Sequence, residues 1–170
     1  MYTLSEFEEY KKKLEFLFKR FYEWYTKEGG RFSDHSEQDT ATKFIKPLLE
    51  IFGWDIYNIF EVKEQVRLKI EDKDSFADCV LYYDREPYIV LEIKDLGFGN
   101  LPRTPDGLIV KLLIDQANKL NAIYAVLTRY YQTVIFDPKT GKELAYFDHP
   151  KEYISNFGNL WRYLSKMRAT

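Results

Sequence analysis

Three charged side chains lie inside two apolar stretches of the chain. Asp78 interrupts residues 76–83, and Glu92 and Lys94 interrupt residues 88–94. Short apolar runs of this kind are typical of strands in a protein core. A charge in such a strand is costly to desolvate unless an opposite charge or a metal ion compensates it. These three residues are therefore the first candidates for a site that performs chemistry.

The spacing of the two stretches predicts that the two acids face each other. Residues 84–86 (Asp-Arg-Glu) have the composition of a three-residue loop that would join the stretches into an antiparallel hairpin. With Tyr83 paired to Pro87, Asp78 falls directly opposite Glu92, where cross-strand Cβ atoms are about 4.5–5.5 Å apart. A two-residue turn would instead direct Asp78 away from Glu92, so this prediction depends on the length of the turn.

Two opposed acids beside a lysine have the chemistry of a divalent-cation site. Like charges that face each other across a sheet repel. Lys94 would share a face with Glu92, about 7 Å further along the strand. Mg²⁺ prefers a few carboxylate oxygens together with water and substrate phosphate, which this arrangement would offer. The alternative is an acidic pair on a half-exposed sheet that Lys94 simply neutralises.

The elements before the hairpin are predicted to be two helices. Apolar residues recur at helical spacing over residues 4–27, and Gly29 and Gly30 are expected to end that helix. A second helix should begin after Ser36, which with Asp39 forms a variant of the capping box. It would run to residue 53, with Pro47 marking a kink or a local boundary inside it.

The rest of the chain alternates between strands and helices. We expect a weak strand at residues 56–60, strands at 62–70, 76–83, 88–94 and 122–128, a hairpin at 133–136 and 143–147, and helices at 107–120 and 151–167. This order predicts an α/β fold. A mixed central sheet, an antiparallel meander followed by further strands, would be flanked by helices, with extra helices at both ends.

Length and composition restrict the classes of protein to which the chain can belong. At 170 residues we expect one domain, residues 1–170, with an N-terminal helix extension (1–30), a core (36–147) and a C-terminal helix (150–170). The net charge of −2 argues against a protein that coats nucleic acid by charge alone, but it does not exclude a nuclease. A single cysteine excludes an internal disulfide and a cysteine zinc site. No apolar run approaches the roughly 20 residues of a membrane span, so we expect no membrane partner and a cytoplasmic location.

Several short motifs follow one another over residues 36–136. They are Ser36-Glu37-Gln38-Asp39-Thr40, Phe44-Ile45-Lys46-Pro47-Leu48-Leu49, Gly53-Trp54-Asp55, Ala77-Asp78-Cys79-Val80-Leu81, Val90-Leu91-Glu92-Ile93-Lys94, Gln116 and Ala125-Val126-Leu127-Thr128. In this order they resemble the PD-(D/E)XK nuclease superfamily. The resemblance is to the N-terminal nuclease domain of type I restriction enzyme motor subunits and to its stand-alone relatives. It implies a restriction-endonuclease-like core.

The resemblance also implies roles for individual residues. Asp78 and Glu92 would bind Mg²⁺, for which Mn²⁺ can substitute, aided by the main-chain carbonyl of Ile93. Lys94 would position or activate the attacking water and offset the charge of the phosphate. Glu37 would be an accessory acid that binds metal or orients water, although a glutamate in the first turn of a helix is favoured by the helix dipole in any case.

Gln116 matches the start of a Gln-x-x-x-Tyr signature in these relatives and would support the site or the substrate. Leu120 stands at the position of the tyrosine, so this role departs from the pattern. The partners implied are DNA and a motor or specificity protein, because these 170 residues contain no helicase motor. A homodimer that presents two sites to a duplex is a further expectation.

Two functions follow from these observations. The first is a Mg²⁺-dependent DNA endonuclease that acts in restriction, defence or DNA processing by metal-assisted hydrolysis of phosphodiester bonds. The alternative is a non-catalytic interaction or regulatory module that retains the same fold and binds a partner through one of its terminal helices.

Overall fold

The computed structural model describes residues 4–27 and 36–168 of the chain. Its centre is one six-stranded sheet in which the strands lie side by side in the order of the sequence. The strands are β1 (Val62–Ile70), β2 (Lys73–Tyr83), β3 (Glu86–Ile93), β4 (Tyr124–Thr128), β5 (Thr133–Phe136) and β6 (Glu143–Phe147). β3 and β4 are parallel, and every other neighbouring pair is antiparallel.

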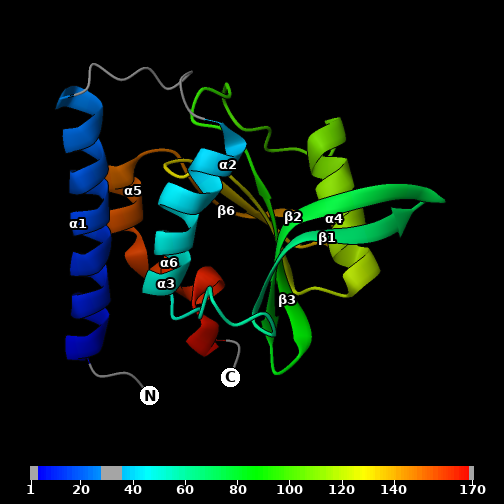
Figure 1. Cartoon of the computed structure of the whole chain (residues 1–170), viewed down its shortest axis with the longest axis horizontal. Coiled ribbons are helices and arrows are strands. Elements are labelled where there is room, and N and C mark those ends of the chain that lie inside the picture. The colour runs from blue at the N-terminus through cyan, green and yellow to red at the C-terminus, as the bar shows by residue number, and fades with distance from the viewer. Residues whose placement is uncertain (1–3, 28–35, 169–170) are drawn as a thin grey trace.

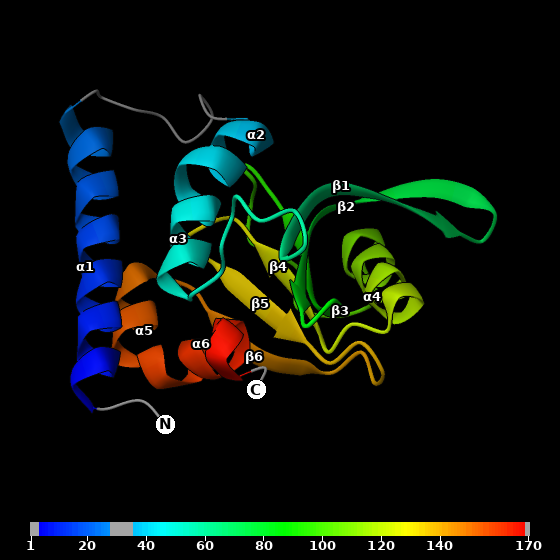
Figure 2. The same ribbon diagram turned by 60° about the horizontal axis from the view of Figure 1, so that its bottom comes forward.

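Helices cover both faces of this sheet. They are α1 (Leu4–Lys27), α2 (Glu37–Thr40), α3 (Lys46–Ile51), α4 (Leu108–Leu120), α5 (Pro150–Ser155) and α6 (Phe157–Leu164). α4 connects the two parallel strands and lies alone on one face, whereas α1, α3, α5 and α6 lie on the other (Figure 1, Figure 2). The predicted α/β fold with a mixed sheet and flanking helices is confirmed. None of the helices in the described residues is both long and apolar enough to cross a membrane.

Two apolar cores stabilise these layers. The larger core lies between the sheet and the helices of its outer face, and it contains most of the buried aromatic rings. Phe18 of α1 lies 5.1 Å from the ring centroid of Tyr130 and 5.2 Å from that of Tyr153, so α1 packs directly on the core. The smaller core lies under α4 and includes Val80, Val90 and Leu127 of the central strands. The abundant aromatic residues therefore contribute mainly to packing.

The second predicted helix forms, with an irregular middle. Ser36 and Asp39 make the reciprocal hydrogen bonds of the capping box, which fixes the start of α2. A π-helical stretch, Ala41–Ile45, joins α2 to α3, and Pro47 lies in the first turn of α3. Proline lacks the N–H that an unbroken α-helix would need, so it marks the predicted local boundary. Gly53 follows the helix with φ +87°, a conformation that glycine adopts without strain.

Two elements differ from the prediction, and both differences have local causes. Residues 56–60 form turns instead of a weak strand, because the side chains of Asp55 and Asn58 accept hydrogen bonds from the N–H groups of Tyr57 and Phe60. The C-terminal segment forms α5, α6 and a 3₁₀ turn, Lys166–Arg168, instead of one helix over 151–167. Asn156 leaves the helical conformation between them, with φ −115° and ψ 29°. Of the predicted N-terminal extension, residues 1–3 and 28–30 lie outside the described part, as does the rest of the loop to residue 35.

The turn between β2 and β3 has two residues, which corrects the predicted three-residue loop. Asp84 and Arg85 both have positive φ, 48° and 69°, as a two-residue hairpin turn requires, and Tyr83 pairs with Glu86. A β-bulge follows at once, because Leu81 pairs with Ile89 while Tyr82 pairs with Pro87. The extra residue in β3 restores the predicted register from Leu81 onward. The predicted register therefore holds from Leu81 to Cys79, although the predicted turn was wrong, and the pairing of the two strands ends one residue before Asp78 and Glu92.

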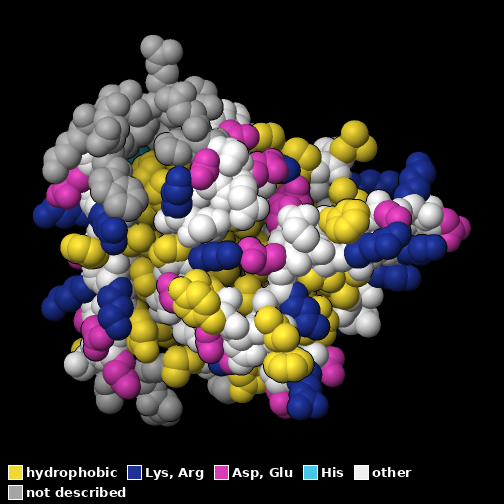
Figure 3. Space-filling view, in the orientation of Figure 1, with side chains coloured by type: hydrophobic (Ala, Val, Ile, Leu, Met, Phe, Trp, Pro, Cys, Tyr) yellow, Lys and Arg dark blue, Asp and Glu magenta, His cyan; other side chains and the backbone are white. Residues whose placement is uncertain are grey.

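The hairpin formed by β1 and β2 extends beyond the body of the molecule. Both strands pass in front of α4 and continue past it, as the two ribbon views show (Figure 1, Figure 2). Basic and acidic side chains both lie along this extension (Figure 3): residues 66–77 contain Arg67, Lys69 and Lys73 and also Glu71, Asp72 and Asp74.

Candidate functional site

The candidate site forms where β2 and β3 separate. Cys79 and Leu91 are the last pair between these strands, so Asp78 and Glu92 come next and are not paired with each other, while Glu92 pairs with Leu127 of β4. Asp78 Oδ2 accepts a hydrogen bond of 2.7 Å from the N–H of Ile93. This bond holds the Asp78 carboxylate against the strand that carries Glu92.

Lys94 lies between two carboxylates. Its Nζ is 2.6 Å from Glu92 Oε1 and 3.3 Å from Glu37 Oε1. The main-chain N–H of Lys94 donates to the carbonyl of Thr128, so β4 holds the lysine in place although β3 ends at the preceding residue. Glu37 comes from α2, 57 positions earlier in the chain. The structure therefore brings together four predicted site residues from three elements.

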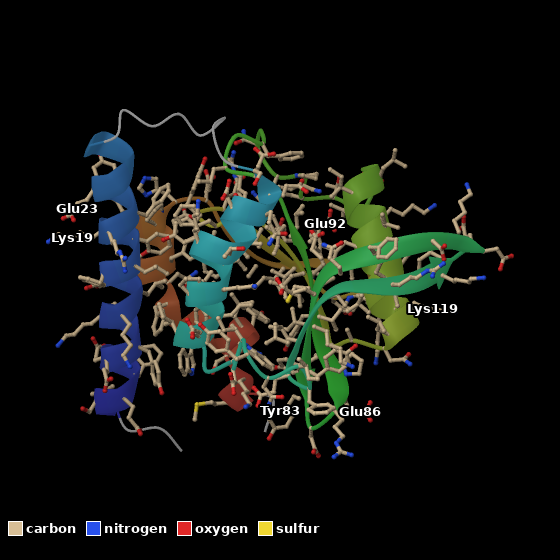
Figure 4. The ribbon with its side chains drawn as sticks, viewed as in Figure 1. Lys19, Glu23, Tyr83, Glu86, Glu92 and Lys119 are labelled. Atoms are coloured by element: carbon tan, nitrogen blue, oxygen red, sulfur yellow. The ribbon has the colours of Figure 1, made fainter. Side chains whose placement is uncertain are left out.

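A pocket of about 430 Å³ lies in front of these residues. Its lining is largely polar and comes from α2, the start of the π-helical stretch, and the strands β1, β2 and β3: Glu37, Gln38, Ala41, Glu64, Gln65, Asp78 and Ile93. Glu92 lies beside it near the end of β3, between α2 and α4 (Figure 4). Its side chain is 17% exposed and that of Lys94 is 13% exposed, whereas Glu37 is 52% exposed. The site thus combines a partly buried ion pair, Glu92 with Lys94, and one accessible acid, Glu37.

The site has an excess of negative charge. Glu37, Glu64, Asp78 and Glu92 supply four carboxylates, against the ammonium groups of Lys94 and of Lys46, which pairs with Glu64 at 3.0 Å. These ion pairs of the cluster therefore leave a surplus of two negative charges. A surplus of two charges in a polar pocket matches the charge of a divalent cation.

Burial raises the pKa of Glu92 above its ordinary value. The hydrogen bond from Lys94 lowers this pKa, but burial and repulsion from Asp78 and Glu37 outweigh that bond. Burial opposes the charge of Lys94, yet its hydrogen bonds and attraction to Glu92 and Glu37 are stronger, so the pKa of Lys94 is also raised. Lys94 is accordingly a cation throughout the neutral pH range.

These shifts predict how stability depends on pH in the absence of a divalent cation. The folded protein holds the Glu92 proton more tightly than the unfolded chain does, so ionised Glu92 lowers the free energy of unfolding at neutral pH. Glu92→Gln should therefore have a higher melting temperature than the parent protein in EDTA at neutral pH. The difference should shrink as the pH falls through the raised pKa of Glu92.

Thermal unfolding of both proteins between about pH 4.5 and 8 tests this expectation. A variant that is less stable than the parent at neutral pH, with a difference that does not depend on pH, would contradict the raised pKa.

The donor groups of the site fit a hard divalent cation. Asp78 and Glu92 offer carboxylate oxygens, and Ile93, which lines the pocket, offers a main-chain carbonyl. Mg²⁺ usually takes one or two carboxylates and keeps several waters, so it does not need a cage made entirely of protein. Within residues 4–27 and 36–168, no three His, Cys, Asp or Glu side chains converge on one point. In the metal-free protein the ammonium of Lys94 compensates the negative charge of Glu92.

The side chain of Gln116 makes its hydrogen bonds to β2 and not to Lys94. Its side chain is buried, and its Nε2 donates to Ser75 Oγ at 2.9 Å and to the carbonyl of Phe76 at 3.1 Å. Gln116 Oε1 has no hydrogen-bond partner. The glutamine thus attaches α4 to β2 two residues before Asp78, and its predicted role in supporting the site stays a prediction.

Gln65 and Glu64 of β1 belong to the site, although neither was predicted. Gln65 Nε2 donates to Asp78 Oδ1 at 3.3 Å, and Gln65 has φ +50°, which is uncommon for a glutamine. Backbone strain of this kind is frequent at functional sites. The sequence does contain a signal, because Glu64 stands at a position where the alternation of Val62, Val66 and Leu68 calls for an apolar residue.

Comparison with known proteins supports the fold. No family model matches the chain, and no curated protein matches it. One similar solved structure is the DrdV–DNA complex, with 16% identity and a TM-score of 0.51, covering 95% of this chain and 14% of the other. Another is a fragment described as an HsdR subunit of a type I restriction enzyme from Vibrio vulnificus YJ016, with 24% identity and a TM-score of 0.45, covering 74% of this chain and 26% of the other. The chain therefore spans a small part of each, and the likeness to DrdV confirms the restriction-endonuclease-like α/β fold.

Proposed function

We propose that this chain is a metal-dependent nuclease domain that hydrolyses phosphodiester bonds in DNA. The observation that carries the proposal is the position of Lys94, a partly buried cation held between Glu92 and Glu37, next to a pocket that Glu37, Glu64 and Asp78 line. The resemblance of the surrounding motifs to the PD-(D/E)XK superfamily gives the same residues a catalytic role.

Asp78, Glu92 and the carbonyl of Ile93 would hold the cation, Mg²⁺ or Mn²⁺. When bound, such an ion stabilises negative charge on a phosphate and promotes the ionisation of water. The hydrogen bond from the Ile93 N–H fixes the Asp78 carboxylate before any ligand arrives. A preorganised carboxylate needs little rearrangement on binding, which favours affinity.

Lys94 acts as a fixed positive charge for the phosphate. In the metal-free protein Glu92 and Glu37 raise the pKa of Lys94, so it is a cation there and can stabilise the charge that develops in the transition state. Glu37 is the more exposed carboxylate of the pair around Lys94, so it can accept a hydrogen bond from the attacking water.

DNA is the substrate in this proposal because the DrdV structure, which shares the fold, is a complex with DNA. Since the chain spans 14% of the length of that protein, a motor or specificity protein would supply the remaining functions. The biological setting that fits is restriction, defence or DNA processing.

A plasmid-nicking assay tests the function. The purified protein should convert supercoiled plasmid to nicked and linear forms when Mg²⁺ or Mn²⁺ is added, and EDTA should stop the reaction. The alternative, a non-catalytic module with the same fold, predicts no cleavage. It also predicts no Mn²⁺ binding by calorimetry below millimolar concentration, so the two measurements together separate the two functions.

A further inference from the structure

The extension of β1 and β2 has one packed face and one bare face. We call residues 66–77 of these strands, with their connecting turn, the arm. Val66 and Leu68 turn toward α4 and pack against the smaller core, together with Ala77 of β2. The opposite face carries the cross-strand pairs Arg67–Phe76 and Lys69–Asp74.

The bare face combines an exposed ring with two cations. Phe76 is 51% exposed, and the side chains of Arg67 and Asp74 are 66% and 44% exposed. Arg67, Lys69, Asp74 and Phe76 are all exposed. The face therefore presents an apolar ring opposite Arg67 and two cations, Arg67 and Lys69, on a projecting ribbon.

The bare face leads directly into the candidate site. Phe76 precedes Asp78 by two residues of β2, which corresponds to about 7 Å, the rise of two base pairs of duplex DNA. Gln116 of α4 bonds to Ser75 and to the carbonyl of Phe76, so the base of the arm is fixed relative to the site. A duplex with one phosphate at Asp78 would therefore run along the arm.

We propose that the bare face of the arm lies in the major groove of duplex DNA beside the scissile phosphate. This proposal rests on the proposed function, since it takes the position of that phosphate from it. The major groove is about 12 Å wide and admits a two-stranded β-ribbon. Arg67 and Lys69 contact phosphates or base edges there, and the Phe76 ring contacts apolar groups such as thymine methyls on the groove floor.

Asp74 limits this interaction in the free protein. Arg67 is held by Asp74 through two hydrogen bonds of 3.2 and 2.6 Å. Exposed ion pairs of this kind are weak, so the Arg67 guanidinium is readily released to DNA. The Asp74 carboxylate, however, stays next to the DNA and repels it. Removal of this charge should therefore strengthen binding.

The test is duplex binding measured by fluorescence anisotropy in EDTA, so that no hydrolysis is needed. The double variant Arg67→Gln, Lys69→Gln should bind a short fluorescein-labelled duplex about tenfold more weakly or worse, and the slope of log Kd against log salt should fall by about one to two. Phe76→Ala should also weaken binding, whereas Asp74→Asn should bind more tightly than the parent protein.

Two controls match these changes. Lys73 pairs with Ile70 on the opposite face of the arm from Arg67 and Lys69. Lys73→Gln therefore removes a cation from the arm but not from its bare face, and it should weaken duplex binding much less. Phe60→Ala removes a ring that is more exposed than Phe76, 67% against 51%, from the turns before β1 and should leave binding unchanged. Arm variants that bind the duplex like the parent, or that lose single-strand binding alone, would overturn the proposal.

A second measurement separates the arm from the nuclease site. Hydrolysis of bis(p-nitrophenyl) phosphate with Mn²⁺ does not involve the groove, so the arm variants should retain the rate of the parent protein. If the parent protein hydrolyses neither this compound nor DNA, the proposed function fails while the binding comparison still decides the role of the arm.

Discussion

Lys94→Gln is expected to lower the rate of DNA hydrolysis by about two to three orders of magnitude. Glutamine is one atom shorter than lysine, but it keeps a hydrogen-bond donor near the end of the side chain and removes the charge. Because the ammonium lies 2.6 Å from Glu92 and 3.3 Å from Glu37, its loss leaves these carboxylates to repel the phosphate. Initial rates of plasmid nicking in Mg²⁺, compared at equal protein concentration, measure the effect.

Lys166→Gln is the matched control for this variant. Lys166 also forms a half-buried ion pair, 2.6 Å from Glu61, but it lies in the C-terminal 3₁₀ turn and contacts no residue of the site. The Lys166→Gln variant should nick the plasmid at the rate of the parent protein. Equal rates for Lys94→Gln and the parent, with circular dichroism showing both folded, would remove Lys94 from the catalytic machinery.

The second large effect concerns stability. Mg²⁺ at about 100 times its Kd should raise the free energy of unfolding by about 2.7 kcal/mol, which is a rise in melting temperature of roughly 5–10 °C for a chain of this size. Asp78→Asn should abolish this rise. The substitution keeps an oxygen that accepts the hydrogen bond from the Ile93 N–H and loses only the long, exposed bond from Gln65, so the fold without metal should be nearly as stable as in the parent protein.

Asp74→Asn controls for the loss of one negative charge from the same strand. Asp74 lies four residues before Asp78 and pairs with Arg67 at the surface, so its removal should leave the stabilisation by Mg²⁺ intact. Differential scanning fluorimetry with increasing Mg²⁺ measures all three proteins. An unchanged rise in melting temperature for Asp78→Asn would place the cation elsewhere.

The sequence predicted the parts of the fold that depend on neighbouring residues. The capping box of Ser36 and Asp39, the boundary at Pro47 and the order of strands and helices all follow from residues a few positions apart. The alternation of apolar and charged residues also marked the strands that carry Asp78 and Glu92. Such patterns are readable because helix caps, turns and the two faces of a strand are set by local geometry.

The register between β2 and β3 is not determined by the local sequence of the turn alone. A three-residue turn was expected, yet a two-residue turn and a bulge before Ile89 together give the predicted register from Leu81 to Cys79. The bulge places Ile89 and Leu91 in the larger core and Val90 in the smaller one. Burial on both faces of the sheet therefore selects the register, whatever the length of the turn.

The site itself was decided by contacts between residues that are far apart in the chain. Motifs indicated Asp78, Glu92, Lys94 and Glu37, but only the packing of α2 against the strand ends brings Glu37 within 3.3 Å of Lys94. The role of Gln65 depends on a left-handed backbone conformation opposite Asp78, which no pattern of residue types specifies. Local sequence thus determined which side chains were available. Their partners, burial and pKa shifts arose from the tertiary structure, because electrostatic and hydrogen-bond energies depend on distance in space and not on separation along the chain.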